Sequence, residues 1–259
     1  FGIPLYGTMA HSFIEAHPDE VSAFRHFLTS HPGSGVLLID TWDTERAAHR
    51  VVELAREDPA TREAIKGVRI DSGDLGDHAR RVRRILDEGG LEGVTIFASG
   101  NLDEYAIADL AADGAPVDGL GVGTRLDVAS DAPYLDCAYK LQSYAGTPRR
   151  KRSEGKGTWA GPKQIHREHR DGRMAGDRLT TADEAAPGHP LLHPVLRVGE
   201  PVTERPRLAA IRETAAAELA ALPEALRSLE PAVEPYPVHV SERLRAVTAE
   251  ADHLGDAPT

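Results

Sequence analysis

The chain has 259 residues and a formal net charge of −11 at pH 7, and its length favours one large α/β domain with appendages over two small domains. The acidic balance argues against a general nucleic-acid binder, because such binding needs clustered Lys and Arg, and no apolar stretch approaches the ~20 residues of a membrane span. The single cysteine, Cys137, excludes an intramolecular disulfide and a cysteine-rich zinc site, which favours a reducing cytoplasm.

Short apolar runs that stop at Asp, Ser, Thr or Gly recur along the first half of the chain. Each run predicts a buried strand with a polar carboxyl end. These strands are expected within residues 2–13, 35–41, 67–74, 94–101 and 119–125. Because the chain begins directly at the first run, with no cap or linker before it, we expect an N-terminal part to be missing.

Segments with the apolar period of a helix separate the later strands, at residues 44–57, 75–87 and 102–112. Strand starts recur every ~25 to 33 residues, the length of a βα unit, so a parallel sheet is predicted. In such sheets ligands bind at the carboxyl ends of the strands, where helix N-termini offer free N–H groups. The polar strand ends are therefore the candidate active site.

The alternation of strand and helix ends near residue 145. Residues 145–173 are rich in Gly, Lys and Arg. Strand-like pieces at 139–144 and 163–167 bracket a loop there that could fold over a bound anion. The basic residues Lys156, Lys163 and Arg167 would then meet a diphosphate or ATP, although solvated surface charges are the alternative.

The last third of the chain has a different composition. From about residue 174, prolines leave little room for helix. Helices are expected after them at 207–222, 224–229 and 241–251, the last capped by Ser241. We predict two domains, a partial α/β barrel at 1–170 and an extension packing on it at 171–259.

Four sequence strings occur together in order: GTMAHSF at 7–13, DTWDT at 40–44, GVRIDSGDL at 67–75 and GVGT at 121–124. Together they closely resemble the nicotinate phosphoribosyltransferase family. The string SEGKGTWAGPKQI at 153–165 also looks like that family's lysine-bearing segment, with Ala160 in place of a proline and Pro162 after the glycine. The resemblance covers residues 1 to about 170, and the tail matches weakly.

The resemblance implies an irregular TIM-like α/β barrel of the type II phosphoribosyltransferases, with a helical and irregular C-terminal extension. It implies an enzyme that joins nicotinate to 5-phosphoribosyl-1-pyrophosphate in NAD salvage, giving nicotinate mononucleotide and pyrophosphate. ATP hydrolysis would be coupled through a phosphorylated histidine, with Mg²⁺ present. The family also implies a homodimer and small-molecule substrates.

Roles for individual residues follow from this resemblance. His11 would be the phosphorylated histidine, since a neutral imidazole is a nucleophile near pH 7. Thr8 and Arg69 would bind nicotinate, because a guanidinium matches a carboxylate bidentately. Asp71 would accept hydrogen bonds from ribose hydroxyls, and it joins His11 and Arg69 in the expected catalytic set.

Two further groups complete the expected site. Asp40 and Asp43 would hold Mg²⁺, because hard cations prefer oxygen ligands. Glycines that let backbone N–H groups approach phosphate oxygens, with neighbouring hydroxyl and amide groups, predict the phosphate site: Ser99, Gly100, Asn101, Gly121, Gly123 and Thr124. The structural alternatives are that Arg69 pairs with Asp71 or Asp40 and that Asp43 caps the following helix.

Spaced histidines, at 166 and 169 and at 189 and 193, have ligand-like spacing but no cysteine partners, so surface or structural roles are favoured. Three other functions stay open. The chain could be a non-catalytic or partner-dependent part of such an enzyme, or a relative that uses nicotinamide or quinolinate. An aldolase is a weaker alternative, because no lysine lies on an inner strand to form a Schiff base.

Overall fold

The computed structural model describes residues 6–128, 130 and 132–255. These form two compact units, one made of residues up to 135 and the other of residues from 136 onward. The predicted boundary after residue 170 falls in the turn between β7 (Lys163–Arg170) and β8 (Arg173–Thr181). Those strands are antiparallel neighbours from Lys163↔Thr181 to Arg170↔Arg173, so the division lies earlier because the whole hairpin belongs to the second unit.

The first unit is built on a parallel sheet with the strand order β1-β2-β3-β4. Its strands match the runs expected from the sequence: β1 (Gly35–Leu38), β2 (Ile65–Ile70), β3 (Thr95–Ala98) and β4 (Gly119–Leu120). The fold is α/β as predicted, but this sheet is open, and no sheet of the described residues closes into a barrel. The first expected strand falls largely on residues 1–5, outside the described residues.

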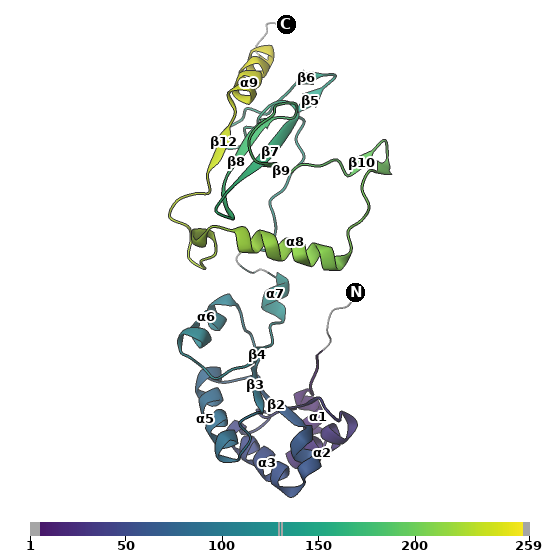
Figure 1. Cartoon of the computed structure of the whole chain (residues 1–259), viewed down its shortest axis with the longest axis vertical. Coiled ribbons are helices and arrows are strands. Elements are labelled where there is room, and N and C mark those ends of the chain that lie inside the picture. The colour runs from purple at the N-terminus through teal and green to yellow at the C-terminus, as the bar shows by residue number, and fades with distance from the viewer. Residues whose placement is uncertain (1–5, 129, 131, 256–259) are drawn as a thin grey trace. The chain divides into compact units, whose positions relative to one another are not determined.

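Helices follow the strands of this unit as the periodicity predicts. They are α3 (Thr44–Glu57), α5 (Leu75–Glu88) and α6 (Glu104–Ala112), on the outer side of the sheet in Figure 1, with the short α4 (Pro59–Ala64) and α7 (Thr124–Val128) between strands. Two more helices, α1 (His11–Glu15) and α2 (Glu20–Ser30), precede β1. These two, together with α4 and α7, are absent from the sequence prediction.

Aspartates begin most of these helices. A side chain at each N-cap accepts the N–H three residues on, which satisfies one free donor of the first turn: Asp19 for α2, Asp43 for α3, Asp58 for α4, Asp74 for α5 and Asp103 for α6. The caps therefore fix where each helix starts, and so where each loop at the carboxyl end of a strand stops.

The core of the first unit lies between the sheet and α3 and α5. Fully buried side chains from β1 and β2, such as Leu37 and Val68, meet the apolar faces of the two helices, where Val51 and Val82 are also fully buried. Burying such side chains stabilises the fold by roughly 1.5–3 kcal/mol each. A packed core of this kind holds the strand ends rigidly.

The second unit is built on the β7–β8 hairpin. Its sheet has the order β12-β8-β7-β9, with β9 (His189–Pro190) and β12 (Val238–Val240) at the edges. Two small pairs lie apart from it: β5 (Ser143–Tyr144) with β6 (Thr147–Pro148), and β10 (Leu196–Arg197) with β11 (Glu200–Pro201).

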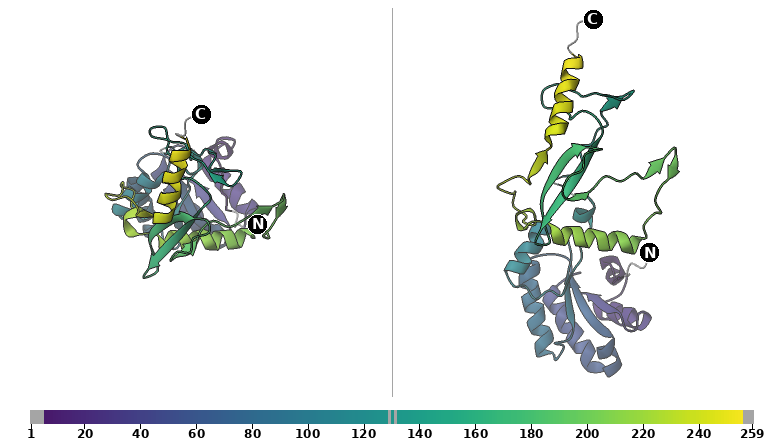
Figure 2. Two further views of the ribbon diagram at one scale, coloured as in Figure 1. Left: turned by 90° about the horizontal axis from the view of Figure 1, so that it is seen from above. Right: turned by 45° about the horizontal axis from the view of Figure 1, so that its top comes forward.

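Helices α8 (Leu208–Ala221) and α9 (Glu242–Gly255) and the 3-10 turn η1 (Glu224–Leu226) complete the second unit and match the expected positions. Helix α9, yellow in Figure 2, contacts β8 of the hairpin and β6. The hydroxyl of Ser241 accepts the N–H of Leu244, as expected for the cap of this helix. Among the described helices, none combines the length and apolar character needed to cross a membrane.

Candidate active site at the strand ends

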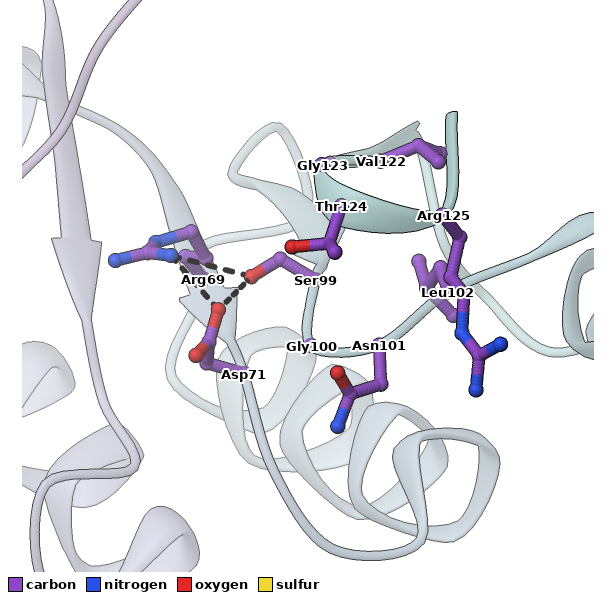
Figure 3. A pocket seen from close by; sticks show the side chains of 11 residues that line it. Arg69, Asp71, Ser99, Gly100, Asn101, Leu102, Val122, Gly123, Thr124 and Arg125 are labelled. Atoms are coloured by element: carbon purple, nitrogen blue, oxygen red, sulfur yellow. Dashed lines mark hydrogen bonds and ion pairs between the residues drawn. The ribbon is translucent and has the colours of Figure 1, made fainter. Parts of the chain in front are cut away.

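The carboxyl ends of β2, β3 and β4 surround a pocket of about 360 Å³. The parallel register brings these ends to one edge of the sheet, because Arg69 lies opposite Phe97 and Phe97 opposite Gly119. The pocket contains the whole predicted phosphate set together with two residues of the predicted catalytic set (Figure 3): Ser99, Gly100, Asn101, Gly121, Gly123, Thr124, Arg69 and Asp71.

Arg69, Asp71 and Ser99 form a triangle of hydrogen bonds at one wall of the pocket (Figure 3). Nη1 of Arg69 lies 2.9 Å from Oδ1 of Asp71 and 3.2 Å from Oγ of Ser99. The Ser99 hydroxyl in turn donates to the same Asp71 oxygen. The structural alternative for Arg69, a pair with Asp71 that ties strand ends together, is therefore present in the structure.

His11 contacts the buried carboxylate of Asp40. Its Nε2 lies 3.2 Å from Oδ1 of Asp40, whose side chain is 1% exposed, whereas that of His11 is 39% exposed. The other Asp40 oxygen accepts the backbone N–H of Asp71 at 2.9 Å and the hydroxyl of Ser72 at 2.6 Å. Asp40 thus links the expected phosphorylated histidine to the loop that carries Asp71.

The segment before His11 is fastened to two strands. Nη2 of Arg69 donates to the carbonyl oxygen of Met9 at 2.8 Å, and the Thr8 hydroxyl donates to the carbonyl oxygen of Val36. His11 therefore lies next to the carboxyl end of β1, whereas Thr8 contacts Val36 within that strand. Neither residue lines the pocket itself. The Arg69 side chain joins the two groups.

Asp43, one of the two expected metal ligands, caps α3. Its Oδ1 accepts the N–H of Arg46 at 2.9 Å, which is the structural alternative weighed for this residue. Asp40 already accepts three hydrogen bonds. Across the described residues, no group of three or more His, Cys, Asp or Glu side chains is placed to hold a metal ion. Both carboxylates thus bind donors of the chain itself, and their role towards Mg²⁺ stays a prediction.

The basic residues of the expected flap belong to the second unit and differ in their contacts. Nζ of Lys163 donates to Oε1 of Gln142 and to two backbone carbonyls, at 3.1, 2.8 and 2.5 Å, and burial lowers the Lys163 pKa. Arg167 forms a bidentate pair with Asp177, at 2.9 Å for both contacts, which raises the pKa of the guanidinium. The Lys156 side chain is exposed.

The structure also places residues at the site that sequence reasoning did not assign. Ser72 bonds to Asp40, and its position inside the DSGD string is the signal that marks it. Arg125 lines the pocket and follows the GVGT string directly. Nothing in the sequence marks the Met9 carbonyl, because any residue could supply it.

Known proteins are similar to this chain in sequence and in fold. Residues 186–248 match the family described as nicotinate phosphoribosyltransferase C-terminal domain, which extends the resemblance into the tail, where the short motifs match weakly. The chain is 45% identical over 258 residues to a nicotinate phosphoribosyltransferase of Mycobacterium tuberculosis, covering 99% of this chain and 55% of that protein. The chain thus spans about half the length of the curated relative.

Two solved structures resemble the fold. The crystal structure of human nicotinic acid phosphoribosyltransferase matches with a TM-score of 0.78 at 26% identity, covering 96% of this chain and 62% of that chain. A nicotinate-nucleotide pyrophosphorylase from Pyrococcus furiosus matches with a TM-score of 0.67, also at 26% identity, covering 85% and 56%. By sequence and by fold, the chain is a member of the nicotinate phosphoribosyltransferase family.

Proposed function

We propose that the protein acts as a nicotinate phosphoribosyltransferase, forming nicotinate mononucleotide and pyrophosphate from nicotinate and 5-phosphoribosyl-1-pyrophosphate in NAD salvage. The observation that carries the proposal is the triangle of Arg69, Asp71 and Ser99 at the wall of a glycine-lined pocket. In this proposal Asp71 is an acceptor for sugar hydroxyls, and the glycine-lined loops beside it would bind a phosphate. The similarity to the mycobacterial enzyme along 99% of the chain supports the same reaction.

In this proposal the pocket binds the 5-phosphate and Asp71 orients the ribose. The pyridine nitrogen attacks the anomeric carbon, a C–N bond forms, and the C–O bond to the diphosphate breaks with its electron pair leaving on the diphosphate. The site contributes mainly positioning and stabilisation of an oxocarbenium-like state. Nη1 of Arg69 is committed to Asp71 and Ser99, and Nη2 donates one proton to the carbonyl oxygen of Met9. Nicotinate would be met by the second Nη2 proton and by the backbone at Thr8.

His11 would couple ATP hydrolysis to this transfer. A carboxylate can only accept, so the contact with Asp40 places the imidazole proton on Nε2 and leaves a lone pair on Nδ1. Nδ1 would attack the terminal phosphorus of ATP, and the bond to ADP would break. Hydrolysis of the phosphohistidine would then return the ring to its starting state. With an exposed fraction of 39%, the His11 side chain is open to a nucleotide.

Four further features belong to the proposal. Mg²⁺ would accompany the diphosphate, with Asp40 and Asp43 as its expected ligands. The parallel sheet would form part of an irregular α/β barrel. The assembly would be a homodimer, which light scattering on the purified protein would test. The location would be cytoplasmic, which fractionation of cells would test.

The test of the reaction is detection of nicotinate mononucleotide by mass spectrometry, with nicotinate, 5-phosphoribosyl-1-pyrophosphate and Mg²⁺, with and without ATP. Product that rises with ATP supports the proposal. Folded protein that gives no product favours the non-catalytic or partner-dependent alternative. Competition between nicotinate, nicotinamide and quinolinate in the same assay separates the three pyridine specificities.

A further inference from the structure

We propose that Ser99 is a positioning residue, which orients the Asp71 carboxylate towards the ribose rather than binding phosphate itself. This inference rests on the proposed function and deepens it. A serine beside a glycine at a strand end is an ordinary phosphate ligand, and the sequence assigns Ser99 that role. The hydrogen bonds of the Ser99 hydroxyl point to the different role.

The Ser99 hydroxyl has one proton to donate. It donates this proton to Oδ1 of Asp71, and it accepts from Nη1 of Arg69 at 3.2 Å. The carbonyl oxygen of Ile70 is a more distant acceptor at 3.4 Å. With its proton directed at a carboxylate, Ser99 has no donor left for a phosphate oxygen, which offers only acceptors.

Thr124 is the contrasting hydroxyl on the same pocket. Its side chain is exposed, and no described residue bonds to its hydroxyl. Ser99, in comparison, is only 7% exposed. The structure therefore contains one hydroxyl that is held inside the wall and one that is available to a ligand.

The loops after β3 and β4 pack closely against Ser99 and Asp71. A Cβ added at Gly121 would lie 3.0 Å from Cβ of Ser99, and one added at Gly100 would lie 1.9 Å from the carbonyl oxygen of Asp71. The two glycines thus allow the loops after β3 and β4 to pack against Ser99 and Asp71. Glycine is therefore needed at positions 100 and 121 for a second reason besides phosphate binding, because the backbone segments approach each other closely there.

The consequence falls on Asp71. Arg69 and Ser99 both donate to Oδ1 of Asp71, whereas no described residue donates to its Oδ2. Two donors on one oxygen fix the plane of the carboxylate, and the free oxygen is left for a ribose hydroxyl. Preorganising an acceptor in this way avoids the cost of ordering it when the sugar binds.

The test removes the Ser99 hydroxyl and a ribose hydroxyl of the ligand, separately and together, and compares the binding affinities. Isothermal titration would measure the affinities of ribose 5-phosphate, 2-deoxyribose 5-phosphate and inorganic phosphate for the wild-type chain and for Ser99→Ala. We expect the wild type to prefer the ribose ligand over the deoxyribose ligand by about tenfold, the value of a hydrogen bond to a charged acceptor. Ser99→Ala should lose most of this preference and keep its affinity for inorganic phosphate.

Three further variants complete the design. Asp71→Asn should lose the same preference, whereas Thr124→Val should weaken all three ligands and keep the preference. Ser99→Cys keeps a side chain of similar size but has only a weak donor, so it should lose the preference for ribose as Ser99→Ala does. It provides the same test if Ser99→Ala fails to fold. Thermal unfolding of each variant reports any loss of fold separately from the change in preference.

Two results would overturn the assignment. If Ser99→Ala binds inorganic phosphate and both sugars more weakly by one common factor, Ser99 is a phosphate ligand. If Ser99→Ala and Ser99→Cys retain the full preference for ribose, Ser99 does not position Asp71. A wild-type chain that binds none of the three ligands would instead contradict the proposed function, and the positioning role with it.

Discussion

Oδ1 of Asp40 lies 3.2 Å from Nε2 of His11. The acid is almost fully buried and its other oxygen holds the Asp71 loop, so one rigid carboxylate sets both the orientation and the tautomer of the imidazole. The neutral ring in this contact carries its proton on Nε2. Any phosphorylation at His11 would therefore depend on a lone pair at Nδ1, which Asp40 maintains.

The His11→Ala variant should abolish stimulation by ATP and leave slow transfer. Asp40→Asn should lower the ATP-stimulated rate by about a hundredfold, because an amide N–H facing Nε2 favours the opposite tautomer. Ser72→Ala, which removes a different contact of Asp40, is the matched control and should retain most of the stimulation. Initial rates with and without ATP measure the effect, and undiminished stimulation in His11→Ala would exclude the phosphohistidine.

Gly100 should tolerate no side chain. Its φ is +95°, and an added Cβ would lie 1.9 Å from the Asp71 carbonyl oxygen, so Gly100→Ala must move a backbone. We expect a loss of about 2–4 kcal/mol in the free energy of unfolding. Gly93 has nothing within 4 Å of an added Cβ, and Gly93→Ala should change stability by less than about 1 kcal/mol. Urea unfolding of both variants gives the comparison; equal effects would contradict the close approach.

The first unit was largely predictable because its signals are local. Alternation of short apolar runs with helical periods gave β1 to β4, and α3 was predicted with the same bounds that the structure shows. Parallel strands end at one edge, so residues as far apart in sequence as Arg69 and Thr124 could be assigned to one site. Both line the pocket.

The second unit was harder because its long strands lack an apolar alternation. β7 reads KQIHREHR and carries charges along its length, and β12 pairs with β8 across a long sequence separation. One local signal does mark the hairpin: Asp171 and Gly172, both with positive φ, form the two-residue turn typical of a hairpin. That turn explains why the chain does not divide after residue 170.

Side-chain pairing within the site was the other gap. The sequence shows that Ser99 and Thr124 each follow a strand, but it does not show which hydroxyl meets a carboxylate and which meets solvent. The same holds for Asp40 and Asp43, both acidic and close in sequence, of which one is buried beneath the site and the other caps a helix. These differences arise from contacts between residues that are far apart in the sequence, so the residues next to each side chain do not reveal them.

Lys163 should support the second unit through its ammonium group. Its three acceptors come from Gln142, Trp159 and Gly161, so Lys163→Met would leave carbonyl groups unpaired in a partly buried position. We expect a loss of about 2–3 kcal/mol in the free energy of unfolding. Lys156→Met, at an exposed position of the same basic segment, should change it by less than about 0.5 kcal/mol. If Lys163→Met lowers the free energy of unfolding no more than Lys156→Met does, the hydrogen bonds of Lys163 contribute nothing to stability.

Asp177 should make the stability of the second unit depend on pH. The hydrogen bond from Arg167 holds the pKa of the Asp177 carboxyl below its usual 3.8. A depressed pKa in the folded state contributes stability that is fully present above the unfolded value and is lost as pH falls through the folded value. The window is therefore the acid range below 3.8.

Asp177→Asn should accordingly be less stable than the wild type at neutral pH, by about 1–2 kcal/mol. The gap should close as the pH is lowered towards about 2, because protonated Asp177 no longer differs in charge from asparagine. Asp183→Asn is the matched control, since the Asp183 carboxylate pairs with Arg243 at the exposed surface and such pairs contribute little. Urea unfolding across the acid range measures the gap. A gap that stays constant with pH would mean that the negative charge of Asp177, paired with Arg167, contributes no stabilisation.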